Sequence, residues 1–94
     1  MAKLQFLLNK ETSYMYYDDP KYIELSIQST IIALRDQLMF DGLITVKEAL
    51  KKFGLNTKDI PMETLLHYWS DDVDISYNKT EKDNEFLLIF ETDG

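Results

Sequence analysis

The chain has 94 residues, of which 45% are hydrophobic and 13% aromatic, and it carries a net charge of −7. This length fits a single domain over residues 1–94, and the aromatic content argues against disorder. With no cysteine, a disulfide framework and a thiolate metal site are excluded. No apolar run approaches the roughly 20 residues of a membrane span, so we expect a soluble, cytoplasmic protein.

The first half predicts a strand followed by a long helix. Residues 3–8 are short and apolar, as in a strand. Asp19 and Pro20 are typical of a helix start, and Gly42 of a helix end. Between them one apolar stripe recurs at helical spacing: Ile23, Ile27, Ile31, Leu34 and Leu38. Leu25, Ile32 and Met39 widen it, so we expect this helix to lie centrally.

Two shorter helices are expected next. Thr45 and Glu48 have the spacing of a capping box, in which each side chain satisfies a free N–H of the helix start. Gly54 supplies the end of that helix. Pro61 then fits the first turn of a short third helix over residues 62–69.

The C-terminal residues predict a β-hairpin. Val73, Ile75 and Tyr77 alternate with polar residues, which is the period of a half-buried strand. Residues 78–84 form a polar turn, and residues 86–90 are apolar on both faces, as in a central strand. The predicted fold is α+β, with about three helices packed on a small antiparallel sheet. The element order also resembles that of a winged helix.

The last third of the chain concentrates negative charge. From Asp59 to Gly94 there are ten carboxylates and two lysines, a net charge of −8. A fixed face of this sign attracts basic protein surfaces and repels nucleic acid and anionic membranes; a merely solvated strand face is the alternative. The candidate partner-binding residues are Asp71, Asp72, Asp74, Glu81, Asp83 and Glu85, with Tyr16, Tyr17 and Trp69 as candidate apolar anchors. The alternative for the two tyrosines is that they fold back onto the sheet and enlarge the core.

No pattern points to catalysis, a cofactor or a metal. His67 is the only histidine, without a cysteine to pair with, and we interpret it as a partly buried helical residue. A calcium loop starting at Asp72 would need glycine at its sixth position, where Tyr77 stands. We therefore predict that the chain is not an enzyme. Acidic residues in the third helix and hairpin also argue against DNA binding, which needs lysine and arginine there.

Several motifs resemble a family of small, uncharacterised proteins encoded by phages and prophages of Gram-positive bacteria. They are Asp19-Pro20-Lys21-Tyr22-Ile23, the long helix, Gly42-Leu43-Ile44-Thr45-Val46 with Leu50, Gly54-Leu55, and a tryptophan before two closing strands, here Trp69. That family has glycine before the tryptophan, whereas this chain has Tyr68. The resemblance implies a phage or mobile-element origin and carries over no functional residue.

Three functional hypotheses follow. The first is a phage-encoded, non-enzymatic protein that binds a basic partner protein in the bacterial cytoplasm. One form is an inhibitor of a host nucleic-acid-binding defence or regulatory protein, with carboxylates standing in for phosphates. The second is a virion or assembly component that acts through self-association or capsid contacts. The third is a winged-helix regulator. The sequence leaves the partner and the oligomeric state open.

Overall fold

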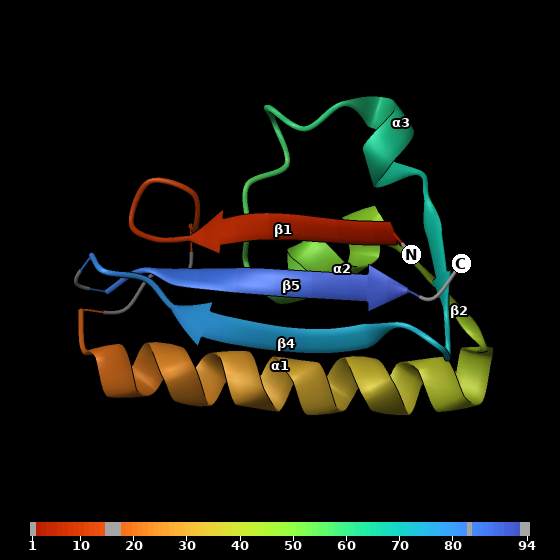
Figure 1. Ribbon diagram of the computed structural model, residues 1–94, viewed down its shortest axis with the longest axis horizontal. Helices are drawn as coiled ribbons and strands as arrows, with labels where there is room; N and C mark the ends of the chain where they lie inside the picture. Colours follow the sequence, from red (N-terminus) through yellow and green to blue (C-terminus); the bar gives the residue numbers. More distant parts are fainter. Residues whose placement is uncertain (1, 15–17, 83, 93–94) are drawn as a thin grey trace.

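The structure is a computed structural model that describes residues 2–14, 18–82 and 84–92. Within this part of the chain the predicted α+β fold is confirmed, with three helices, a three-stranded antiparallel sheet and a two-stranded antiparallel ribbon. In Figure 1 the larger sheet lies in front, with α1 (Pro20–Asp41) along its lower side and α2 (Val46–Lys52) behind it.

The larger sheet brings the two ends of the chain together. Its strands are β1 (Ala2–Leu8), β5 (Phe86–Thr92) and β4 (Asp74–Lys79), in the order β1-β5-β4. The strand predicted to be central, β5, is therefore central. Successive strand residues face opposite sides of a sheet, and only the inner side faces the helices. Phe86, Leu88 and Phe90 are accordingly buried on that side, while Leu87 and Ile89 are half-buried on the other.

Local signals fix both ends of α1. The Asp19 side chain accepts a hydrogen bond from the Lys21 N–H at 2.9 Å, and Pro20 occupies the first turn. At the other end Gly42 has φ 79°, a left-handed conformation that favours glycine, and its N–H donates to the Leu38 carbonyl. The predicted stripe is buried: Ile23, Ile27, Ile31, Leu34 and Leu38.

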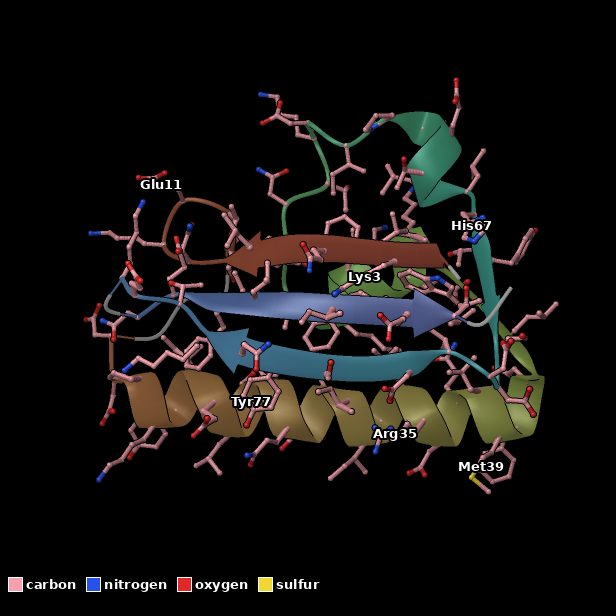
Figure 2. All side chains as sticks on the ribbon, in the orientation of Figure 1. Lys3, Glu11, Arg35, Met39, His67 and Tyr77 are labelled. Carbon is pink, nitrogen blue, oxygen red and sulfur yellow. The ribbon has the colours of Figure 1, made fainter. Side chains whose placement is uncertain are left out.

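The prediction of a central α1 is wrong. Leu25, Ile32 and Met39 are exposed, because they lie off the stripe that meets the core and no other described element covers that side of the helix. Figure 2 shows Met39 at the C-terminal end of α1, pointing away from the sheet. α1 is therefore a peripheral helix that buries one face.

The second helix begins as predicted. In α2 the Thr45 hydroxyl accepts the Glu48 N–H at 3.1 Å, and the Glu48 carboxylate accepts the Thr45 N–H at 3.5 Å, which forms the capping box. Gly54, with φ 76°, follows the end of the helix.

The third helix is shorter than predicted. α3 covers Met62–Leu65 only, and β3 (Tyr68–Ser70) pairs antiparallel with β2 (Leu43–Thr45). Residues 68–69 were expected to be helical. Strand pairing prevails there because Trp69 lies opposite Ile44 and both side chains enter the core. Tertiary burial of this kind often overrides local propensity.

The aromatic core is built around Phe90 of β5. Trp69 stacks on Phe90, with ring centroids 4.4 Å apart and planes 8° from parallel. Phe6 and Phe53 meet the same ring edge-on, at 5.9 and 6.0 Å. This cluster joins β1, β3, β5 and the end of α2 into one hydrophobic core.

Candidate functional site

The predicted acidic residues do not form one face. Asp71 and Asp72 lie in the turn between β3 and β4, and Asp74 begins β4. Glu81 and Glu85 lie beyond the other end of that strand. The six residues of β4 separate the two groups by about 17 Å, at a rise of about 3.3 Å per residue. Tyr16, Tyr17 and Asp83 lie outside the described residues.

Glu85 is a structural residue rather than part of a solvated face. It is only 7% exposed. Its two carboxylate oxygens accept hydrogen bonds from the Asn9 amide and the Thr80 hydroxyl, each at 2.8 Å. These bonds, Asn9 first, hold the pKa of Glu85 below its usual range, although burial acts in the opposite direction. Glu85 thus ties the loop after β1 to the β4–β5 turn.

Trp69 is not available as a surface anchor. It is 3% exposed because it stacks on Phe90 in the core. Its neighbour Tyr68 is 62% exposed, since successive residues of β3 face opposite sides. Of these two neighbouring aromatic residues, Tyr68 and not Trp69 is therefore accessible at the surface.

Exposed apolar side chains gather at the end of the molecule where α1 finishes. Phe40, in the last turn of α1, is 89% exposed. Leu43 and Tyr68 project from the outer side of the β2–β3 ribbon, and the register makes them diagonal neighbours. In Figure 1 the end of α1, the ribbon and the end of α3 line this side of the molecule. We call this the apolar end surface: Met39, Phe40, Leu43, Leu66 and Tyr68.

Carboxylates border the apolar end surface. Because Leu43 pairs with Ser70, the segments carrying Asp41 and Asp71-Asp72 leave the ribbon at the same end. Asp72 accepts a hydrogen bond from the Ser70 hydroxyl. Within the described ranges the only ion pair is between Arg35 and Asp74, at 3.9 Å. The charges of Asp41, Asp71 and Asp72 are therefore not neutralised by a nearby cation.

Periodicity could have identified part of this surface. Leu38 is the last buried member of the α1 stripe, so the next two helical positions, Met39 and Phe40, must point away from the core at about 100° per residue. Leu43 and Tyr68 gave no comparable signal, because their exposure depends on a pairing between distant segments.

His67 differs from its predicted setting. It lies exposed between α3 and β3, and its ring meets Trp69 edge-on at 6.5 Å. No set of three acidic or histidine side chains in the described part of the chain is arranged to hold a metal ion.

Comparisons with known proteins supply no relative. The chain has no significant match to a family model, a curated protein or a solved structure. Among the residues that the structure describes, no helix combines the length and apolar character needed to cross a membrane.

Proposed function

We propose that this chain is a non-enzymatic protein that binds another protein with a basic surface. The observation that carries the proposal is the apolar end surface, where five large exposed side chains lie on elements at one end of the molecule and Asp41, Asp71 and Asp72 have no ion pair. Exposed large apolar side chains grouped on one side of a protein mark interaction sites. Aromatic residues supply much of the affinity at such sites, and a charged rim favours partners of opposite sign.

The proposed partner is a nucleic-acid-binding protein of a bacterial host. Asp41, Asp71 and Asp72 would occupy the place of phosphates against its lysines and arginines, while Phe40 and Tyr68 supply apolar contacts. The resemblance to phage and prophage proteins supports this setting, in which the chain inhibits a host defence or regulatory protein. The proposed binding residues are fewer than the ten carboxylates of residues 59–94. Glu85 is not among them, because its oxygens already accept hydrogen bonds from Asn9 and Thr80.

Capture from a lysate of the host bacterium tests the proposal. Immobilised wild-type chain should retain a basic protein, identified by mass spectrometry, that Phe40→Ser and Asp71→Lys both lose. Glu81→Lys is the matched control, because it makes the same charge change at an exposed residue on the opposite end of the hairpin. Equal capture by all four chains would refute this surface as the binding site.

A second candidate function is a virion or assembly component. The same exposed Phe40, Leu43 and Tyr68 favour it, since an apolar patch on one end also suits contacts between copies. Light scattering separates the two functions: a stable oligomer that persists in high salt and is lost in Phe40→Ser supports assembly, whereas a monomer supports partner binding.

The winged-helix alternative receives little support from the geometry. The helix that would enter the major groove, α3, has four residues, and the hairpin strands β4 and β5 are paired into a sheet with β1. A gel-shift assay at low salt should show no complex with duplex DNA.

A further inference from the structure

The two edge strands of the three-stranded sheet, β4 and β1, have different neighbours. α1 runs along the β4 edge (Figure 1), where Arg35 donates to the Ile75 carbonyl at 3.3 Å. The Tyr77 hydroxyl also links β4 to α1, through Gln28 at 2.8 Å and Glu24 at 3.2 Å. No strand in the described part of the chain pairs with the outer edge of β1. β1 is therefore the open edge.

The backbone direction of β1 follows from one hydrogen bond. The Thr12 hydroxyl donates to the Leu7 carbonyl at 2.8 Å, so this carbonyl points away from β5. In an antiparallel pair the N–H and C=O of one residue face the same side, and the side alternates along the strand. The backbone N–H and C=O groups of Lys3 and Gln5 therefore point away from β5, and so does the N–H of Leu7. Such a row is a template for a further strand.

A groove of ≈ 360 Å³ lies along this edge. Phe6 and Leu7 line its strand side, and Leu55 and Ile60 line the side formed by the segment between α2 and α3. Figure 1 shows that segment passing beside the outer edge of β1. Pockets of roughly 300–1,000 Å³ hold small ligands, so this groove has room for one or two side chains of an added strand.

Two carboxylates line the groove. Its ionisable lining residues are Glu11 and Asp59, both exposed and neither in an ion pair. Figure 2 shows Glu11 in the loop beyond the end of β1. Lys58 neighbours Asp59 in sequence but does not line the groove. We propose that the open edge of β1 binds an extended segment of another protein as an added strand, with an apolar side chain in the groove and flanking lysines or arginines beside Glu11 and Asp59.

A second copy of this chain is a poorer occupant. Each copy has a net charge of −7, and edge-to-edge pairing would bring these like charges together. Main-chain pairing with a basic segment uses the same backbone groups, with side-chain pockets giving specificity, and it gains attraction from the same charges.

A model peptide tests the proposal directly. A fluorescently labelled, acetylated and amidated peptide of alternating lysine and valine should bind the whole chain in an anisotropy titration, more tightly than the matching glutamate–valine peptide. Asp59→Lys should weaken binding about fivefold at low ionic strength, while Glu81→Lys, the same change outside the groove, should not. Equal binding of both peptides, or no effect of Asp59→Lys, would overturn the charge assignment.

Backbone pairing needs its own test. Gln5→Pro removes an outward N–H without removing a β1–β5 hydrogen bond, and proline is tolerated at strand edges. It should reduce peptide affinity at least tenfold while circular dichroism stays unchanged. A lysine–valine peptide methylated on alternate backbone nitrogens should lose affinity equally, which tests pairing even if Gln5→Pro fails to fold. Full affinity of the methylated peptide would refute strand addition.

The two surfaces can be separated. Phe40→Ser should leave binding of the lysine–valine peptide unchanged, because Phe40 ends α1 and is not among the residues of the groove. Loss of peptide binding in Phe40→Ser would place the peptide on the apolar end surface and overturn the assignment to β1.

Discussion

The two ends of the β4–β5 hairpin carry carboxylates in opposite surroundings. Before β4, Asp71 and Asp72 are exposed beside Tyr68, and no cation neutralises them. After the hairpin turn, Glu85 is buried and its oxygens accept bonds from Asn9 and Thr80. Acidic density in a sequence therefore does not define a binding face. A carboxylate is available for a partner only where no hydrogen-bond donor of the same protein already occupies its oxygens.

The largest effect is expected within the aromatic pair next to the exposed end. Trp69→Ala should lower the free energy of unfolding by about 3–5 kcal/mol, because it removes the ring stacked on Phe90 and leaves a cavity. Tyr68→Ala should change it by no more than about 0.5 kcal/mol, as at other exposed positions. Urea denaturation of both variants measures the difference, and similar losses would contradict the assignment of Trp69 to the core and Tyr68 to the surface.

The next effect concerns the buried end. Glu85→Gln keeps the shape of the side chain but weakens the charge-assisted bonds from Asn9 and Thr80. The urea midpoint should fall by less than in Trp69→Ala and by more than in any substitution of Asp71. Asn9→Ala should cost more than Glu85→Gln, because it also removes the amide oxygen that accepts the Glu11 and Thr12 N–H groups, and Glu85→Gln should cost less in the Asn9→Ala background than in the wild type. Additive losses would mean that the two side chains do not act together.

The sequence predicted well whatever depends on neighbours within a few residues. The caps at Asp19 and Gly42, the Thr45–Glu48 box and the buried stripe of α1 are all set by groups one helical turn apart. The alternation of residues in β4 and the apolar run of β5 likewise identified the hairpin and its central strand.

Features that depend on distant pairing were missed. Glu85 is 76 residues from Asn9 in sequence, and no local pattern shows that the carboxylate will find that amide. The sequence of residues 68–69 predicts a helix, but pairing places Trp69 opposite Ile44 in a strand. The candidate site depends on distant pairing in the same way: pairing places Asp71, Asp72 and Asp74 at one end of β4 and Glu81 and Glu85 at the other, and it buries Trp69 while leaving Tyr68 exposed.

The pH dependence of stability provides a third comparison. The pKa of Glu85 is lowered in the folded protein, chiefly by the bonds from Asn9 and Thr80. Its contribution is therefore complete above the unfolded value near 4.5 and is lost as the pH falls through the lowered folded value. Urea midpoints between pH 7 and pH 3 should fall less steeply for Glu85→Gln than for the wild type. A slope as steep in Glu85→Gln as in the wild type would mean that the acid sensitivity does not arise from Glu85.

The smallest effect on stability is expected for substitution of the exposed Asp71, before β4. This substitution is also the most informative about function. Asp71→Lys should change the free energy of unfolding by at most about 0.5 kcal/mol, because Asp71 is exposed and has no ion pair to lose. The substitution also reduces the self-repulsion of a chain with net charge −7, so any change should favour folding. If Asp71→Lys leaves stability unchanged but abolishes capture of a basic protein, the Asp71 carboxylate contributes to binding and not to folding. If Asp71→Lys instead destabilised the chain as much as Glu85→Gln, both ends of the hairpin would be structural, and the proposed binding surface would lose its charged border.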